Sequence, residues 1–401
     1  MTATMNSRVL IFFATLALIV STTTLIFLWA KGYTINRETR KVERVGMISV
    51  KSLPDGARIF LDNTLTLATN TTLGNLKGGT HKLRIEKEGF SSWEKDVLVK
   101  EELVTFVDVI LVPRSVEIKP LTTSGVALPI LNNSKDKIYF LAETSPELDI
   151  AQKSGIWSLD LNSSIFNIFK TGATLVFTDK RGLAYSSAEA LLLSPSDNQM
   201  LIKMNEKGYY LADLGNGDAP AATATAVPAL ETWGKEILNK RRLLSDKYNL
   251  AGDLKEIATD PQTLWSPDEK KFLFRRKNEK GDSWRYFVHN LTDPLGVGEA
   301  DEYLVSTVSL DSEMKFTWYP DSKHLLSSEC ETQPKANQPP GATCASGSIH
   351  LLEIDGTNNT QVYSGSMASD SLFPTPDGSK IIILATFNQT APPNLYAISL
   401  R

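Results

Sequence analysis

Two short sequence patterns alternate five times between residue 131 and the C-terminus, and this repeat is the strongest constraint on the fold. The first is a polar turn followed by an apolar run, and it reads LNNSKDKIYFL, LSPSDNQMLIK, WSPDEKKFLFR, WYPDSKHLLSS and PTPDGSKIIIL. The second is an aromatic-bearing run, and it reads IWSLDL, YYLADL, YFVHNL, IHLLEI and LYAISL. Short strands repeated about every 50 to 70 residues are typical of propeller blades. We therefore predict a mainly β protein with a five- or six-bladed β-propeller over residues 115–401, where a sixth blade would use 115–130 or 175–187.

Four of the five turns of the first pattern contain a proline, and in three copies aspartate follows it. The residues are Pro195, Pro267, Asp268, Pro320, Asp321, Pro376 and Asp377. We favour a structural role, because proline presets φ and the aspartate closes the turn. A ring of carboxylates near the propeller axis is the alternative, but the sequence singles out no residue for it. The turns resemble the Ser-Pro-Asp-Gly-Lys motif of the TolB-like family of β-propeller repeats, most closely at 266–268 and 376–378.

An insertion at about 215–256 separates the second and third repeats. It begins with the Ala/Thr/Pro-rich segment GNGDAPAATATAVPA, which we expect to be a mobile loop. The following residues have apolar side chains at helical spacing, namely Leu230, Trp233, Ile237, Leu244 and Tyr248. Lysines and arginines surround them. The helix either caps the rim of the propeller or faces a partner or a membrane.

Residues 9–30 read VLIFFATLALIVSTTTLIFLWA, which is 22 residues without a charge. This length suffices for a transmembrane helix. A cleaved signal peptide is the alternative, but its apolar region is usually shorter and no A-x-A pattern follows. We therefore expect a short tail at 1–8, a single-pass membrane anchor at 9–30 and a juxtamembrane linker at 31–45.

The orientation of this anchor depends on two opposing signals. Arginines and lysines are concentrated after the span, and this would keep the C-terminal bulk in the cytoplasm. The two cysteines, Cys330 and Cys344, flank one polar, Pro-rich segment and are typical of a disulfide formed in an oxidising compartment. Two unlinked thiols are the alternative. We expect the cell membrane as the location, with the C-terminal bulk extracytoplasmic.

Residues 46–113 alternate apolar and polar side chains in short runs separated by turns, which predicts antiparallel strands in a small β-sandwich. HKLRIEKEG is the clearest run, with Leu83 and Ile85 on one face. The first run, GMISVKS, is followed by the turn Pro54-Asp55-Gly56-Ala57, which we interpret as a corner of this sandwich.

This segment resembles the PEGA domain family, which is named for a Pro-Glu-Gly-Ala motif. The motif stands here as Pro54, Asp55, Gly56 and Ala57, with aspartate in place of glutamate. Further landmarks follow in order in IFLDN, in the turn from Leu76 to His81 and in GFSSW, while the family's Thr-Pro is replaced by Thr69-Asn70. The resemblance implies a non-catalytic module of envelope proteins that binds other surface components.

The sequence contains few signatures of a catalytic, metal or cofactor site. The four histidines and two cysteines have no zinc-ligand spacing, and we expect no metal site and no cofactor. No G-x-S-x-G nucleophile elbow occurs, and no phosphate or dinucleotide loop. The formal net charge of −4 gives no general attraction to nucleic acid, so we expect no nucleic-acid partner.

We therefore predict a membrane-anchored, non-catalytic envelope protein that presents PEGA and propeller surfaces to envelope polysaccharide or to another envelope protein. Two alternatives remain. The first is a propeller-type glycan hydrolase, which would need carboxylates that converge at the propeller axis. The second is a cytoplasmic-facing protein-interaction scaffold, which the basic flank after residue 30 favours and the cysteine pair opposes.

Overall fold

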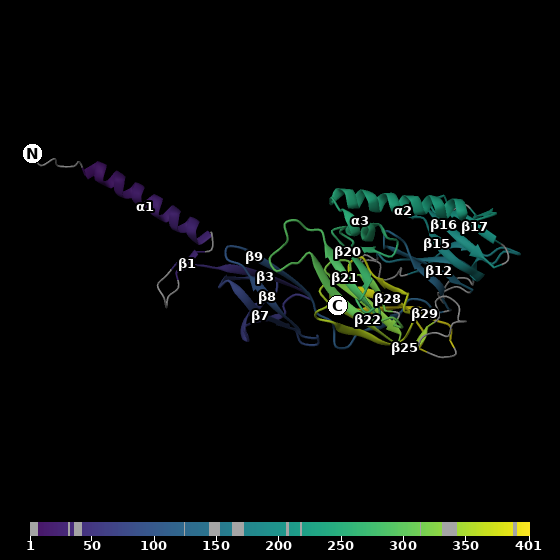
Figure 1. Cartoon of the computed structure of the whole chain (residues 1–401). Coiled ribbons are helices and arrows are strands. Elements are labelled where there is room, and N and C mark those ends of the chain that lie inside the picture. The colour runs from purple at the N-terminus through teal and green to yellow at the C-terminus, as the bar shows by residue number, and fades with distance from the viewer. Residues whose placement is uncertain are drawn as a thin grey trace, which may run out of the picture. The chain divides into compact units, whose positions relative to one another are not determined.

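The computed structural model forms two compact units. Unit 1 comprises residues 1–111 together with 293–300, and unit 2 comprises 112–292 together with 301–401. The structure describes residues 7–30, 33–35, 42–123, 125–143, 153–162, 172–205, 208–216, 219–312, 314–330, 343–387 and 391–401 (Figure 1). The first six residues of the tail, most of the expected linker and the segment between the two cysteines lie outside this part of the chain.

The N-terminal segment is the helix α1 (Ser7–Ala30), followed by the short antiparallel pair β1 (Tyr33–Ile35) and β2 (Val42–Arg44). Its described side chains, from 11 to 27, are exposed and mostly apolar. The hydroxyls of Ser21, Thr22 and Thr24 donate to backbone carbonyls one turn earlier, as expected for polar residues inside an apolar helix. Across the described residues, no helix combines the length and the apolarity required to span a bilayer.

The rest of unit 1 is a sandwich of a three-stranded and a four-stranded sheet, with strand orders β6-β3-β9 and β5-β4-β7-β8. The strands are β3 (Gly46–Leu53), β4 (Arg58–Leu61), β5 (Thr64–Ala68), β6 (Thr71–Leu76), β7 (Gly79–Glu86), β8 (Trp93–Val99) and β9 (Val104–Ile110). The predicted antiparallel pairing is wrong for one pair, since β3 and β9 are parallel. Strand alternation specifies which side chains are buried, but it does not specify a neighbour's direction.

The core of unit 1 lies between these two sheets. On β7, Leu83 and Ile85 are fully buried, while the side chain of Arg84 lies on the opposite face over the ring of Phe60. Ile48 and Ile59 contribute the facing side chains. The period-2 pattern of HKLRIEKEG is thus the pattern of one buried and one solvated sheet face.

The PDGA turn is a corner that hydrogen bonds tie to the neighbouring strands. Gly56 has φ of 68°, a conformation that favours glycine, and Ala57 is fully buried. The hydroxyl of Thr69 lies 2.6 Å from that of Ser52 and accepts the amide of Ala57 at 2.9 Å. The carboxylate-bearing Asp55 is exposed, and its backbone carbonyl accepts Lys87 Nζ. Thr69, at the point where this chain departs from the family pattern, therefore links β3 to the corner.

His81 has an acceptor at both ring nitrogens. Nδ1 lies 2.8 Å from the carboxylate of Asp62, and Nε2 lies 2.9 Å from the carbonyl of Lys77. Burial opposes protonation of the imidazole, but the bonds to Asp62 and Lys77 outweigh it and raise its pKa. The bond from His81 and the amide of Lys82 in turn lower the pKa of Asp62. Each partner thus stabilises the charged form of the other.

We expect His81→Gln to lower the stability of unit 1 by about 0.5–1 kcal/mol at pH 6 and by less at pH 8. The stabilisation from His81 is complete below the unfolded pKa of 6.5 and is lost as pH rises through the raised folded pKa. The stabilisation from Asp62 is present above the unfolded pKa of 3.8 and is lost as pH falls through the lowered pKa of the folded state. Urea unfolding at both pH values measures the difference, and a histidine NMR titration gives the folded pKa. An equal loss at both pH values would contradict the ion pair.

The described part of unit 2 contains five four-stranded antiparallel sheets, which follow one another along the chain. The first two consist of β11 (Ala127–Leu131), β12 (Lys137–Ala142), β13 (Gly155–Asp160), β14 (Thr174–Thr178), β15 (Ala188–Leu193), β16 (Gln199–Met204), β17 (Gly208–Asp213) and β18 (Ala221–Thr223). A short 3-10 helix, Tyr185–Ser187, precedes β15. Part of the expected Ala/Thr/Pro loop is therefore a strand, because β18 pairs with β17 at the edge of the second sheet.

The remaining three sheets repeat this strand order. They consist of β19 (Leu264–Trp265), β20 (Lys271–Lys277), β21 (Ser283–Asn290), β22 (Glu302–Ser309), β23 (Lys315–Trp318), β24 (His324–Cys330), β25 (Cys344–Glu353), β26 (Thr360–Met367), β27 (Leu372–Pro374), β28 (Lys380–Ala385), β29 (Asn394–Ser399) and β10 (Ile118–Pro120). Both candidates for a sixth blade belong to these five sheets, since 115–130 contains β10 and the start of β11, and 175–187 contains most of β14.

The fifth sheet joins the two ends of unit 2. Its outer strand is β10, which precedes the first sheet in the sequence and pairs antiparallel with β29. Beside this pair, the side-chain oxygen of Asn394 accepts the hydroxyl of Thr122 and the amide of Gly125, both at 3.0 Å. Thr122 in turn accepts the amide of Leu395. All of these atoms are buried, so the two ends are held by a satisfied polar network as well as by strand pairing.

Apolar cores lie between neighbouring sheets. Phe140 and Trp157 of the first sheet pack with Ile382 and Leu395 of the fifth, and separate clusters join the first sheet to the second and the third to the fourth. The aromatic-bearing runs differ in how deeply they bury the ring at the position that Trp157 occupies in the first sheet. Trp157 is buried, but Tyr210, Phe287, His350 and Tyr396 remain half-buried.

The insertion forms two helices, α2 (Val227–Lys247) and α3 (Gly252–Thr259), of which only the first was expected. Trp233 of α2 is buried against the second sheet, and Figure 1 shows α2 running beside β16 and β17. Ala258 of α3 packs on Phe272 and Phe274 of the third sheet. Leu230 and Ile237 belong to the predicted apolar face of this helix, but they are 43% and 42% exposed.

Candidate binding site

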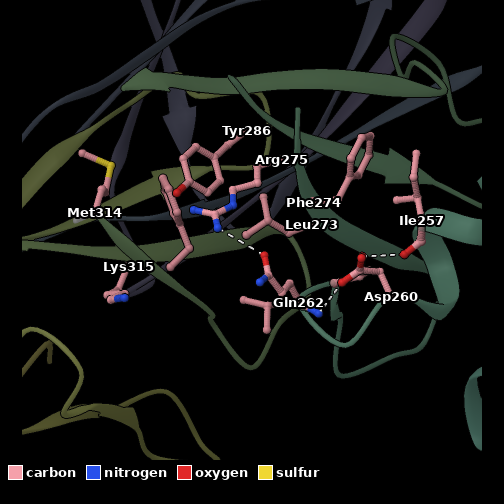
Figure 2. A pocket seen from close by; sticks show the side chains of 12 residues that line it. Ile257, Asp260, Gln262, Leu273, Phe274, Arg275, Tyr286, Met314 and Lys315 are labelled. Atoms are coloured by element: carbon pink, nitrogen blue, oxygen red, sulfur yellow. Dashed lines mark hydrogen bonds between the residues drawn. The ribbon is translucent and has the colours of Figure 1, made fainter. Parts of the chain in front are cut away.

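A cleft of about 470 Å³ opens beside the third and fourth sheets of unit 2, and we call it the Arg275 cleft. Its walls are the segment from the end of α3 to β19, the strands β20 and β21, and the start of β23. The lining residues are Ile257, Asp260, Gln262, Thr263, Leu264, Leu273, Phe274, Arg275, Tyr286, Met314, Lys315 and Phe316. Figure 2 shows Arg275 and Gln262 directed toward each other in this space. The volume lies within the usual range for small-molecule sites.

The pairing of β20 with β21 sets the chemistry of one wall. The register places Leu273 opposite Val288, Arg275 opposite Tyr286 and Lys277 opposite Trp284. Alternation along the strands puts these six side chains on one face of the sheet. Leu273 and Val288 are buried against the fourth sheet, and they hold the face in place. Farther along, the same face carries cations and rings in place of core residues.

Aromatic rings surround the cations of this face. The guanidinium carbon of Arg275 lies 4.2 Å from the centre of the Trp284 ring, and Lys277 Nζ lies 5.5 Å from it. The rings of Tyr286 and Phe316 meet at 4.7 Å between centroids. Such cation–ring contacts keep a flexible side chain in position without neutralising its charge.

The segment 259–263 forms the opposite wall, and Arg241 of α2 holds it. The guanidinium donates to the backbone carbonyls of Thr259, Asp260, Pro261 and Thr263. Burial lowers the pKa of Arg241, although the nearby Asp260 opposes this shift. A single side chain of the insertion thus fixes the backbone that presents Asp260 and Gln262 to the cleft.

We expect Arg241→Met to destabilise unit 2 by about 1–2 kcal/mol and to loosen this wall, because carbonyls that now accept charge-assisted bonds lose their donor. Amide hydrogen exchange over residues 259–263 should accelerate together with the loss of stability. Arg242→Met is the matched control, because its side chain is exposed on the same helix. Unchanged exchange in the Arg241 variant would show that the segment holds its shape alone.

The acidic side chains of the cleft bear on the glycan-hydrolase alternative. Asp260 is the one carboxylate among the described lining residues, and it accepts the amide of Gln262 at 2.6 Å. Glycoside hydrolysis commonly requires two carboxylates on either side of the scissile bond. Within the described part of the chain, no three histidine, cysteine, aspartate or glutamate side chains gather as a metal site.

The Pro-Asp turns are hydrogen-bonded corners in the third, fourth and fifth sheets. Asp268 accepts the hydroxyl of Ser266 at 2.6 Å and the amide of Lys270 at 3.0 Å. Asp321 accepts the amide and ring Nδ1 of His324, and Asp377 accepts Thr375 and Ser379. The prolines Pro195, Pro267, Pro320 and Pro376 precede or start the same corners. The structure thus assembles no ring of free carboxylates from these residues.

The pKa values of these aspartates agree with this structural role. Burial alone would raise the pKa of Asp268, Asp321 and Asp377, but the bonds within each turn outweigh it and lower all three. Asp197, in the second sheet's turn, has its pKa lowered in the same way by four bonds from Asn133 and Ser134. The charged carboxylates are therefore saturated by donors from the protein.

Neighbouring turns contact one another. Asp197 bridges to the first sheet's turn, the amide of Asp268 donates to Ser322 Oγ at 3.1 Å, and Tyr319 Oη donates to the carbonyl of Gly378 at 2.5 Å. Burial raises the pKa of Tyr319 to about 12. The turns follow β19 and β23, whereas the Arg275 cleft lies where these strands begin. The turns and the cleft are thus at opposite ends of β19 and β23.

The residues of the cleft were not singled out from the sequence. The available signal was KFLFRRK followed by SWRYFVHN, in which cations and rings alternate at strand spacing. The register that places Arg275 and Lys277 beside Tyr286 and Trp284 cannot be read from either run alone. The contributions of Gln262 and Phe316 come from other elements of the fold.

Comparison with known proteins identifies one module of the chain. Residues 45–115 match the PEGA domain, in agreement with the predicted resemblance. No protein of curated function matches the sequence.

Solved structures that resemble the chain are β-propellers and related proteins. An oligogalacturonate lyase from Vibrio parahaemolyticus is 9% identical, with 92% of this chain and 96% of the lyase covered and a TM-score of 0.24. A protein from Agrobacterium tumefaciens described as TolB is 11% identical, with 89% and 99% covered and a TM-score of 0.23. The Swd1 β-propeller domain from Myceliophteria thermophila is 8% identical, with 72% and 100% covered and a TM-score of 0.33. At these scores the matches bear on neither substrate nor mechanism.

Proposed function

We propose that this protein is a non-catalytic binding protein of the cell envelope, and that the Arg275 cleft is where unit 2 holds its ligand. The observation that carries the proposal is the composition of the cleft. The exposed Arg275 and the half-buried Tyr286 line one wall, with Trp284 beside Arg275, and the exposed Lys315 and the half-buried Phe316 of β23 lie next to it. A backbone segment fixed by Arg241 forms the opposite wall, and the one carboxylate of the described lining is bonded to its own turn. The PEGA match supports an envelope setting for this activity.

For the architecture, we propose that the five sheets of unit 2 form a closed five-bladed propeller. The pairing of β10 with β29 and the core shared by the first and fifth sheets support closure. In such a ring the cleft would lie on the face where the inner strands begin. Propellers commonly use their faces to bind partners, although the fold by itself assigns no activity.

We further propose that α1 anchors the protein in the membrane, with both units outside the cytoplasm. The uncharged run at 9–30 and the exposed apolar side chains of α1 support an anchor, and the bond between Cys330 and Cys344 supports an oxidising compartment. Protease treatment of intact cells tests the orientation. Cleavage after residue 46 from outside is the expected result, and protection until the membrane is opened would reverse the orientation.

Binding by the cleft is tested with purified full-length protein in detergent and isolated envelope polysaccharide. Arg275→Ala and Trp284→Ala should each abolish most of the binding. Arg276→Ala is the matched control, since Arg276 is the next residue on β20 but lies on the opposite face, near Glu302. Equal binding by all of these variants would place the ligand site elsewhere.

A further inference from the structure

We infer that the ligand of the Arg275 cleft is an acidic saccharide, whose carboxylates bind the cations of β20 and β23 while its ring faces pack on the aromatic side chains. This inference rests on the proposed binding function and specifies the class of ligand.

The cations of the cleft lack carboxylate partners. In the described part of the chain, no carboxylate forms an ion pair with Arg275, Lys277 or Lys315. Several other cations of the same unit are paired, among them Arg276, 3.4 Å from Glu302, and Lys203, 2.8 Å from Glu189. Although the chain has a formal net charge of −4, the described residues thus include two cations that line the cleft, Arg275 and Lys315, and one beside it, Lys277, without a carboxylate partner. Their opposite charge would attract an anionic ligand.

Arg275 is held in position before any ligand binds. Its ring contact with Trp284 orients the guanidinium plane, and its Nη2 donates to the side-chain oxygen of Gln262 at 3.2 Å. A guanidinium has five N–H donors, and its planar fork matches the two oxygens of a carboxylate. Gln262 is in turn fixed by Asp260, whose carboxylate accepts a hydrogen bond from the backbone N–H of Gln262. A donor that is already ordered loses little entropy on binding, which favours affinity.

The aromatic side chains add a surface suited to a sugar. Trp284, Tyr286 and Phe316 are half-buried, so each presents part of its ring while the rest is packed. Pyranose rings have apolar C–H faces that pack on aromatic rings, and their hydroxyls bond to groups such as the amide of Gln262. An isolated inorganic anion would use the cations and leave the rings without a function. The combination therefore favours a carboxylated saccharide over a simple anion.

The test compares two ligands that differ in charge alone. Full-length protein in detergent is titrated by calorimetry with a hexuronate oligomer and with the same oligomer after reduction of its carboxyl groups. We expect at least tenfold tighter binding of the acidic form, at least tenfold weaker binding by Arg275→Gln, and less than a twofold change for Arg276→Gln. Affinity for the acidic form should also fall as the salt concentration rises.

The outcomes separate the inference from the proposed function. Equal binding of both oligomers, with no effect of Arg275→Gln, would overturn the acidic-saccharide inference and leave a saccharide-binding protein. If correctly folded protein, with its normal urea unfolding curve, binds neither oligomer, the inference is overturned. If it also fails to bind isolated envelope polysaccharide or any envelope protein, the proposed function is overturned as well. Equally tight, Arg275-dependent binding of a single-stranded DNA oligomer would also overturn the inference, because it would show a site for polyanions in general.

Discussion

Replacing Asn394 with leucine should lower the free energy of unfolding of unit 2 by about 2–4 kcal/mol. The oxygen of Asn394 accepts the hydroxyl of Thr122 and the amide of Gly125, and leucine accepts neither. Thr122 is 1% exposed and Asn394 is 7% exposed, so water does not readily replace the lost acceptor. Each buried donor left without a partner costs about 1–3 kcal/mol. Urea unfolding of the two proteins measures the difference.

A double-mutant cycle distinguishes this network from a simple packing effect. Thr122→Val removes the hydroxyl that donates to Asn394. In the double variant this hydroxyl is therefore not left as a buried donor without an acceptor, as it is in Asn394→Leu alone. The two losses should therefore sum to more than the loss in the double variant, by about 1 kcal/mol. Strict additivity, or a loss below about 0.5 kcal/mol for Asn394→Leu, would show that the network does not hold the two ends of unit 2 together.

Loss of the disulfide between Cys330 and Cys344 should destabilise unit 2 by about 3 kcal/mol. The bond closes a loop with a sequence separation of 14, and closing a loop of this length removes about that much chain entropy from the unfolded state. The cysteines end β24 and begin β25, and Ser328 of β24 pairs with Lys315. The bond therefore lies at the same end of the fourth sheet as Lys315, and its loss should also weaken ligand binding at the Arg275 cleft.

The measurement compares unfolding in urea with and without a reducing agent. Cys330→Ala/Cys344→Ala should unfold like the reduced protein, and the reducing agent should not affect it. Alkylation of the protein in native membranes provides an independent check, because bonded cysteines react only after reduction. Labelling of both cysteines without reduction would remove the disulfide and, with it, the main support for an oxidising compartment.

The sequence predicts the local units of this protein well. A Pro-Asp turn followed by an apolar run gives a turn and a strand in each copy, because proline restricts φ and the aspartate accepts donors two residues away. The PDGA corner follows from the same type of interaction. Helical spacing in 227–247 likewise predicts α2, although its exposed Leu230 and Ile237 show that spacing does not decide which face is covered.

The sequence does not reveal partners that are far apart in the chain. β10 could have begun a sixth sheet, but it completes the fifth, because β29 has an open edge and Asn394 has partners in Thr122 and Gly125. Similarly, β9 satisfies the predicted alternation while it pairs parallel to β3. Alternation is equally consistent with each of these pairings, so packing decides among them.

The turns, strands and PEGA landmarks were thus determined by the sequence itself, since each depends on backbone preferences and hydrogen bonds among residues a few positions apart. The Arg275 cleft, by contrast, is formed only by the tertiary structure. Arg241, Gln262, Arg275 and Phe316 come from four separate elements, and their meeting depends on strand register and on sheet packing. A binding site built from such distant residues has no local signature, because no short segment contains enough of it to be stable or recognisable alone.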